Sequence, residues 1–337
     1  MISIPYSVVE KAKALFPKRI ENQRTNACTK LEKLKNAKLE SIESDYLNKV
    51  IDLFKYTNII TAQPSQLEQW KATIGKCPKR QIMNPNTNKM EDKPVLKDLI
   101  LKCLGYKELR SSFYPEYFSE IGLKTCVYCN SQLVVVVETK TGNSKAKFQA
   151  DHYHNKSDYP FLSISLYNLY PACSSCNGAK STKDVEFELY VKKPSSSFFH
   201  FELDKPGLTS YLTDPKRKDL LKVNFTEPPP PANKKTFSEC FDIEGIYNTQ
   251  TDIAEEMVLR ARMYNEAYRK SLEKNYKGLF PSGTDTIERI LWGNYMKDSD
   301  IHKRPMAKFM QDIRKQLLRL RKIRKELLNL PIRKVTL

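Results

Sequence analysis

The sequence contains few of the residues and patterns that would assign it directly to a class. Only four histidines, ten glycines and two tryptophans occur among its 337 residues. It has no Gly-x-x-x-x-Gly-Lys sequence, so nucleotide-driven regulation would have to come from another chain. No apolar run approaches the ~20 residues that span a bilayer, and the start MISIPYSVVEKAKALF lacks the pattern of a secretory signal. We therefore expect a cytoplasmic protein with no membrane partner.

Acidic residues are also scarce relative to basic ones. The chain has 39 aspartates and glutamates against 57 lysines and arginines, which gives a formal net charge of +18. An excess of this size favours a polyanionic partner, most commonly nucleic acid, although a merely solvated surface is the alternative. With 40% hydrophobic and 28% charged residues, the composition is that of a folded globular protein.

Periodicity and composition divide the chain into four regions. Residues 1–120 and 241–337 have apolar positions at helical spacing, residues 121–200 contain a compact α/β segment, and residues 201–240 form a Pro-rich basic connector. We therefore expect a mainly α fold with a small α+β insert. The last helix has a basic face and an apolar stripe. The basic face is expected either to bind nucleic acid or only to keep the helix soluble, and the stripe to pack either on its own domain or on a partner. The stripe consists of Met306, Phe309, Ile313, Leu317, Leu320, Ile323, Leu327 and Leu330.

Four of the eight cysteines form two Cys-x-x-Cys pairs, Cys126 with Cys129 and Cys173 with Cys176. In a reducing compartment such pairs favour metal ligation over disulfides, and two pairs match a four-thiolate zinc site. Four protein ligands close the coordination shell, so this zinc would be structural. Buried free thiols or redox dithiols are the alternative, but the thioredoxin-like context of a redox dithiol is missing.

The residues between the cysteine pairs suit phosphodiester cleavage. SQLVVVVETK and AKFQADHY are predicted to pair as a hairpin around the turn TGNSK, with Asp151 and His152 at the end of its second strand. Asn168 precedes the second cysteine pair, and Asn177 follows it. A carboxylate and an amide oxygen can hold Mg²⁺, a neutral imidazole can accept a proton from water, and a second amide can orient that imidazole. Lys180, one turn after Asn177, can contact phosphate.

The same run resembles the HNH (ββα-metal) endonuclease family, in the subgroup held together by a four-cysteine zinc site. The resemblance lies in CVYC, DH, NL and CSSCN, and it implies a ββα-metal core surrounded by helices. It also implies roles for single residues. His152 would be the general base, Asp151 and Asn177 would bind the catalytic Mg²⁺ or Mn²⁺, and Asn168 would orient the imidazole.

The flanking sequences are similar to the HNH nuclease subunits of Septu-type and retron-associated bacterial anti-phage systems. This similarity lies in DHYHNKSDYPFLSISLYNLYPAC, FDIEGIYNTQTDIAEE and KRPMAKFMQDIRKQL. It implies a nuclease effector that acts with an SMC-like or AAA-type ATPase. DNA is favoured over RNA as the target, but the choice stays open because a ββα-metal site can act on either.

Each candidate also has a structural interpretation. Lys180, Lys156 and His154 are candidate substrate-binding residues, but each can instead be a surface charge or a packed side chain. The asparagines are also typical caps of turns and helices. The sequence leaves two hypotheses. The first is a metal-dependent HNH endonuclease, and the second is a catalytically inactive, zinc-stabilised subunit that binds nucleic acid or a partner.

Overall fold

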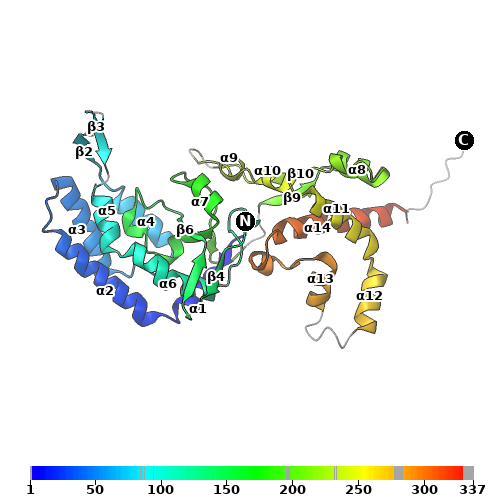
Figure 1. The fold of residues 1–337 in the computed structure, drawn as a ribbon, viewed down its shortest axis with the longest axis horizontal. Coiled ribbons are helices and arrows are strands. Elements are labelled where there is room, and N and C mark those ends of the chain that lie inside the picture. The colour runs from blue at the N-terminus through cyan, green and yellow to red at the C-terminus, as the bar shows by residue number, and fades with distance from the viewer. Residues whose placement is uncertain are drawn as a thin grey trace, which may run out of the picture.

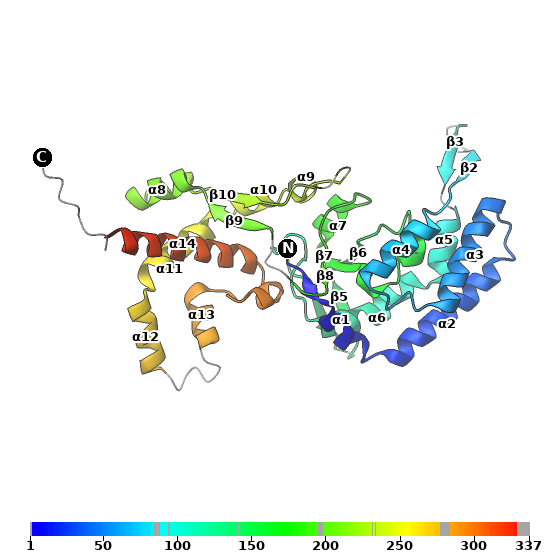
Figure 2. The same ribbon diagram turned by 180° about the vertical axis from the view of Figure 1, so that it is seen from behind.

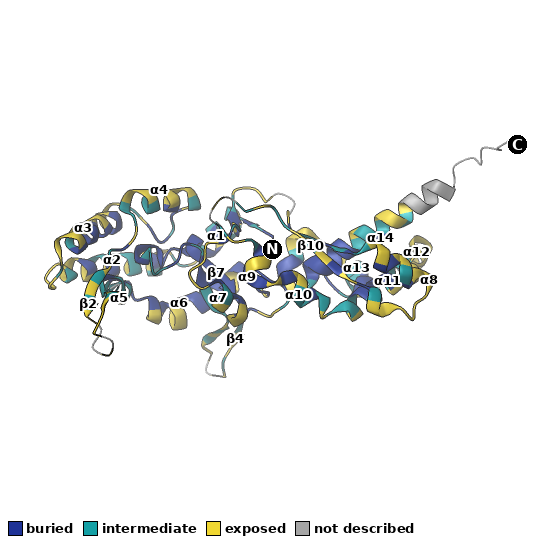
Figure 3. Cartoon of the chain, turned by 90° about the horizontal axis from the view of Figure 1, so that it is seen from above, coloured by how far each residue is buried: buried dark blue, intermediate teal, exposed yellow. Residues whose placement is uncertain are grey.

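The protein is elongated, with helices at both ends and small strands between them (Figure 1). The computed structural model describes residues 2–83, 86, 88–93, 95–140, 142–194, 198–230, 232, 234–276 and 284–328, with side chains up to position 322 in the last helix. About 55% of the chain is helical, which confirms the mainly α prediction. Buried residues form one cluster from Ile4 to Leu317, along the whole length of the molecule (Figure 3). Among the described helices, none combines the length and the apolar character needed to cross a bilayer.

The N-terminal lobe, residues 2–121, is a bundle of helices with one projecting hairpin. Its long helices pack pairwise, α2 against α3 and α1 against α6. Helix α6 is bounded by Gly105 and Gly122, whose φ angles of 64° and 76° are left-handed and end the helical path on either side. The helices are α1 (Tyr6–Lys13), α2 (Pro17–Leu34), α3 (Ser41–Tyr56), α4 (Pro64–Ile74), α5 (Val95–Cys103) and α6 (Tyr106–Ile121), and the hairpin is β2 (Arg80–Met83) with β3 (Met90–Lys93).

The central unit, residues 125–180, contains two antiparallel strand pairs and a short helix. The predicted hairpin forms between β4 (Val135–Glu138) and β5 (Ser144–Lys147), but its second strand does not continue to His152 as we expected. The chain bends at Phe148, and β6 (Gln149–His152) pairs instead with β7 (Leu169–Ala172). Helix α7 (Ser174–Lys180) follows β7 directly. The bend separates the exposed hairpin from the buried strand that bears Asp151 and His152.

The segment 201–240, expected to be a connector, contains regular structure. It includes most of β9 (His200–Leu203), then α8 (Lys205–Thr213), β10 (Val223–Thr226) and the start of α9 (Phe237–Phe241). Strands β9 and β10 form an antiparallel pair. These elements are held by apolar side chains, since Phe201 and Leu203, at alternate positions of β9, are fully buried. The four-region division itself stays a prediction.

The C-terminal lobe, residues 200–328, is built around α14 (Ala307–Leu328). Strand β9 lies against one side of α14 and α11 against another (Figures 1 and 2). Phe309, Ile313 and Leu317 of the predicted stripe are buried, whereas Leu320 is 40% exposed. This part of the stripe therefore packs within its own lobe; the side chains of Ile323, Leu327 and Leu330 lie outside the described residues. The remaining helices are α10 (Ile243–Asn248), α11 (Thr251–Met263), α12 (Glu266–Asn275) and α13 (Thr284–Trp292).

Candidate metal centre and adjoining cleft

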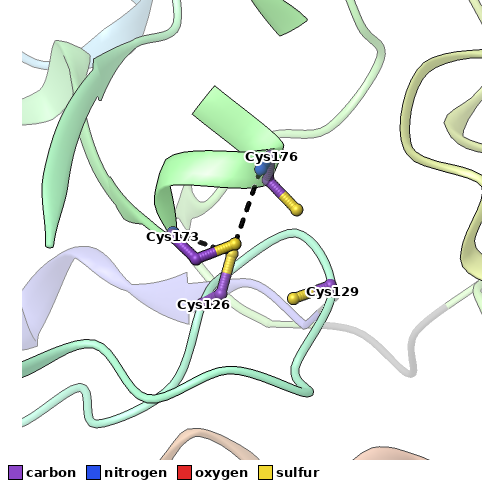
Figure 4. A group of neighbouring side chains, drawn as sticks. All are labelled: Cys126, Cys129, Cys173 and Cys176. Carbon is purple, nitrogen blue, oxygen red and sulfur yellow. Dashed lines mark hydrogen bonds between the residues drawn. The ribbon is translucent and has the colours of Figure 1, made fainter. Parts of the chain in front are cut away.

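The four paired cysteines come together in the central unit. Cys126 and Cys129 lie in the loop between α6 and β4, and Cys173 and Cys176 lie at the start of α7 (Figure 4). Their Sγ atoms all lie within 4.8 Å of one another, and all four residues are buried. Sulfurs at ~2.3 Å from a tetrahedral zinc ion are roughly 3.8 Å apart, so a small closure of the cluster gives that geometry. The cluster therefore has the donors and the spacing to hold a metal such as zinc.

Hydrogen bonds to the sulfurs favour their thiolate forms. The backbone N–H of Cys173 donates to Cys126 Sγ at 3.3 Å, and that of Cys176 donates to Cys173 Sγ at 3.5 Å. The Ser131 hydroxyl donates to Cys129 Sγ at 3.2 Å. These contacts match the requirement that a thiol lose its proton before it binds a metal.

The loop of the first cysteine pair also contacts the C-terminal lobe. Asn130, which follows Cys129 and is fully buried, has a left-handed φ of 54°. Its amide group donates to the Ile301 carbonyl at 3.0 Å and accepts from the Lys308 N–H at 2.9 Å. The Tyr247 hydroxyl donates to the Cys129 carbonyl at 2.8 Å. Metal binding here would therefore stabilise the contact between the central unit and the C-terminal lobe as well as the central unit itself.

A cleft beside the cysteine cluster brings several of the sequence candidates together. We call it the α7 cleft: a cavity of about 300 Å³ lined by Asp151, His152, Asn155, Lys156, Ser157, Asn177, Gly178, Ser181 and Thr182. The proposed base, both proposed ligands of the catalytic metal and one proposed substrate lysine thus border a single hollow. Strand β6 supplies Asp151 and His152, and Asn177 lies on α7 directly after the last cysteine.

Asp151 is held at one of its two oxygens. Oδ2 accepts a hydrogen bond of 2.5 Å from the Tyr128 hydroxyl and lies 3.1 Å from Lys180 Nζ. Both donors belong to the cysteine framework, because Tyr128 lies between Cys126 and Cys129 and Lys180 ends α7. The carboxylate is therefore fixed by the same segments that hold the thiols.

His152 is held in one tautomer. Its Nε2 lies 3.1 Å from the Ser163 carbonyl oxygen, which can only accept a hydrogen bond, so Nε2 bears the proton and Nδ1 has the free lone pair. The ring packs 5.0 Å from the Tyr106 ring of α6. Burial, followed by the positive charge of Lys156, lowers the pKa of His152 to about 3. The imidazole is consequently neutral at physiological pH.

Asn168 acts on the backbone around His152 rather than on its ring. The fully buried side chain accepts from the His154 N–H at 2.7 Å and donates to the carbonyls of His154 and Leu162, at 3.2 and 3.0 Å. Leu162 precedes Ser163, whose carbonyl holds the imidazole. That Asn168 orients the imidazole stays a prediction; its contacts in the structure are to the backbone on either side of the groups that hold His152.

The three predicted substrate-binding residues have different surroundings. Lys156 borders the α7 cleft and lies 4.9 Å above the Tyr106 ring. His154 is buried with its Nε2 3.2 Å from Glu68 Oε1 and does not line the cleft. Lys180 is only 1% exposed, and its ammonium donates to the His152 carbonyl at 2.8 Å as well as binding Asp151. The phosphate contact of Lys180 stays a prediction; in the structure its ammonium is engaged by Asp151 and the backbone.

Three residues important to the cleft were missed by the sequence analysis. Tyr128 is anchored by its position inside a Cys-x-x-Cys, which directs its side chain inward, so its location was a usable signal. Ser163 contributes only a backbone carbonyl, and Tyr106 comes from a distant helix. Neither of these contacts has a signature in a single sequence.

Fold and site together define a mainly helical protein with a candidate metal centre. Part of the chain is similar to the Septu protein PtuB of Bacillus thuringiensis, with 33% identity over 70 residues. The match covers 20% of this chain and 24% of that protein, so the chain spans about a quarter of the length of the curated relative that it matches. No protein-family model and no solved structure matches the chain.

Proposed function

We propose that the protein is a metal-dependent endonuclease of the HNH type that hydrolyses phosphodiester bonds in nucleic acid. The observation that supports this most directly is the α7 cleft, where Asp151, His152 and Asn177 border one cavity. The order of β6, β7 and α7 gives a ββα unit, and the four-cysteine cluster lies at the start of its helix. This is the arrangement that the HNH resemblance implies.

The proposed cofactors are a structural zinc ion at the four cysteines and Mg²⁺ or Mn²⁺ in the α7 cleft. The cleft suits a weakly held hard cation, because Asp151 and Asn177 offer oxygen donors and Asp151 has one oxygen beyond its bonds to Tyr128 and Lys180. Such an ion, when bound, neutralises negative charge on the scissile phosphate and the leaving oxygen.

His152 is the proposed general base. Its Nε2–H is fixed on the Ser163 carbonyl, so Nδ1 is the atom that can take a proton from an attacking water. Its low pKa keeps Nδ1 unprotonated before the reaction, and an incoming phosphate adds negative charge that makes the imidazole more basic. Lys156, at the cleft and near Tyr106, is placed to bind that phosphate.

The proposed setting is bacterial anti-phage defence. The partial similarity to the Septu protein PtuB supports this, together with the flanking resemblance to nuclease subunits of such systems. We propose that the chain acts in the cytoplasm with an SMC-like or AAA-type ATPase, on DNA in preference to RNA. The net charge of +18 supports a nucleic-acid target.

The test is metal-dependent cleavage by the whole chain, alone and with its ATPase, of plasmid DNA and of RNA. We expect cleavage with Mg²⁺ or Mn²⁺, no cleavage with EDTA, and a loss of roughly a hundredfold or more in His152→Ala. The variant's zinc content and circular dichroism should match the wild type. The control is His200→Ala, which removes a histidine of the C-terminal lobe that lies beside Asp312, outside the α7 cleft, and it should retain most of the rate. Equal rates in His152→Ala and wild type would reject the proposed base.

One observation favours the alternative, an inactive subunit that binds nucleic acid or a partner. Lys180 places a positive charge 3.1 Å from Asp151, which weakens the attraction of that carboxylate for a cation. This hypothesis predicts nucleic-acid binding that EDTA and His152→Ala leave unchanged, with no cleavage under any condition.

A further inference from the structure

A second hollow lies between α6 and the β4–β5 hairpin, next to the α7 cleft. It has a volume of about 510 Å³, and its charged lining residues are Lys107 and Arg110 from α6 and Lys145 from β5. All three are exposed, and the hydroxyls of Ser111 and Ser144 lie among them. We call this hollow the α6 groove.

The cations of the α6 groove are not neutralised by its other walls. No carboxylate occurs among the described residues that line it. The hollows of the C-terminal lobe differ, because there Glu288 bonds to both Arg269 and Arg314, at 3.0 and 2.6 Å. Uncompensated positive charge in a concave surface attracts an anion from solution. The α6 groove is therefore suited to an external anion. In the hollows of the C-terminal lobe, by contrast, the arginines already have a carboxylate partner.

The α6 groove lies close to the α7 cleft. Ala150 lines the groove, and the next residue, Asp151, lines the cleft. The buried Tyr106 lies near both, because its hydroxyl donates to the Ala150 carbonyl at 3.5 Å and its ring packs 5.0 Å from the His152 ring. Arg110 donates to the Gln149 side chain at 3.0 Å, which fixes it on the strand that leads to the cleft. The cations of the groove thus lie within a short distance of the cleft in which we propose that nucleic acid is cleaved.

We propose that the α6 groove binds the phosphate backbone of duplex DNA on one side of the bond to be cleaved, an inference that rests on the proposed function. The lining of α6 from Lys107 to Pro115 is roughly 12 Å long, which corresponds to three or four base-pair steps of ~3.4 Å. The groove offers point charges and hydroxyls, the groups that contact phosphates rather than bases.

Duplex DNA fits this lining better than single-stranded RNA does. Recognition of single strands relies on exposed aromatic rings on which bases stack. Tyr114 in the groove is only 1% exposed, and Phe148 packs edge-on against Phe118 with ring centres 5.2 Å apart. The rings of the groove are thus engaged in the core.

The test compares two charge-matched double variants of the full chain. Lys107→Gln/Lys145→Gln removes two cations of the groove, and the control Lys33→Gln/Lys49→Gln removes two exposed lysines of α2 and α3. Binding of a fluorescent 30-bp DNA duplex is followed by anisotropy in EDTA over a series of salt concentrations. Each lost phosphate contact lowers the slope of log affinity against log salt by about 0.9. We expect a slope reduced by about two and affinity roughly tenfold weaker for the groove variant, with less than a twofold change for the control.

Several results would overturn the proposal. These are equal effects of the two double variants, no binding of the duplex by the wild type, or a loss confined to a parallel RNA duplex of the same sequence. Cleavage measured alongside separates this proposal from the proposed function. Metal-dependent cleavage with unchanged binding in the groove variant rejects the groove alone. Groove-dependent binding without any cleavage supports the groove and rejects the nuclease.

Discussion

The central unit and the C-terminal lobe contain closely similar buried groups. In the central unit, Asp151 pairs with Lys180, and His152 bonds through Nε2 to a backbone carbonyl. In the C-terminal lobe, Asp312 pairs with the buried Lys308. His302, in the segment before α14, bonds through Nε2 to the Ile2 carbonyl at 2.8 Å. Burial lowers the pKa of both histidines to about 3.

The two sets differ in what surrounds them. Asp151 and His152 border the α7 cleft, while Asp312 and His302 line neither that cleft, nor the α6 groove, nor the two hollows of the C-terminal lobe that Arg269 and Arg314 line. Asp312 also accepts from the Phe201 N–H at 3.1 Å and lies 3.5 Å from His200 Nδ1, so its contacts tie α14 to β9. Residue type and burial are therefore the same in both places, and the two histidines also share a lowered pKa. Access to a cavity is what distinguishes the candidate catalytic groups from the structural ones.

The largest expected effect that separates the two regions comes from removal of the metal. Cys173→Ser should lose the zinc, because three thiolates and a hydroxyl bind it far more weakly, and metal binding contributes directly to folding. We expect mass spectrometry to find less than one zinc per chain. Relative to the wild type, hydrogen exchange should become faster in β6, β7 and α7 and should change less in α11 and α14. Cys240→Ser, a buried cysteine outside the cluster, is the control and should retain zinc. Full zinc occupancy in Cys173→Ser would contradict the assignment of this ligand.

Matched substitutions of the two aspartates test the difference in function. Asp151→Asn should lower the rate of plasmid nicking by roughly a hundredfold or more, about 3 kcal/mol in the barrier, because it removes the charge that holds the cation. Asp312→Asn leaves Lys308 as an unpaired buried charge, so it should lower the free energy of unfolding by about 3 kcal/mol while the folded fraction keeps its rate. Plasmid nicking and urea unfolding, each measured on both variants, check these two expectations. An equal loss of nicking in Asp151→Asn and Asp312→Asn would show that the two aspartates do not differ in function.

The sequence predicted the cysteine cluster and four of the nine residues that line the α7 cleft, for a definite physical reason. Cys-x-x-Cys spacing and the Asp-His dipeptide are local patterns, and the zinc ligands bring the two ends of the segment together. The mainly helical lobes were predictable from apolar periodicity. These features depend on short stretches of chain.

The parts that the sequence did not predict depend on long-range contacts. The bend at Phe148 exists because β6 pairs with β7, and that pairing is made by residues about twenty positions later. Lys180 has the spacing of a surface lysine, yet the approach of β6 to α7 buries it on Asp151. The segment 201–240 contains proline-rich sequence, but Phe201 and Leu203 find partners on α14, a hundred residues away.

A smaller effect is expected from titration of His302, which has no neighbouring candidate metal ligand. Its pKa of about 3 in the folded protein lies below the ordinary value of 6.5, so protonation favours the unfolded chain. The stability that the neutral ring contributes is complete above pH 6.5 and is lost as the pH falls from 6.5 towards 3. At pH 5 the loss is about 2 kcal/mol.

His302→Gln keeps a donor for the Ile2 carbonyl and cannot titrate. We expect urea unfolding of this variant to change between pH 7 and pH 5 by about 2 kcal/mol less than that of the wild type. Identical pH dependence of the two proteins would show that His302 is not buried as described.

The smallest effect tests whether the cysteine framework positions the carboxylate of the cleft. Tyr128→Phe removes the hydroxyl that bonds Asp151, and Tyr247→Phe removes the one that bonds the Cys129 carbonyl on the other side of the same loop. Each variant loses one buried hydrogen bond, and we expect its free energy of unfolding to fall by about 1 kcal/mol. Only Tyr128→Phe leaves the carboxylate free to turn, so only this variant should need roughly fivefold more Mg²⁺ for half-maximal cleavage. Because the two losses of stability match, a shift of the Mg²⁺ requirement in both variants would assign it to general loosening of the loop. A shift in Tyr128→Phe alone would assign it to the orientation of Asp151.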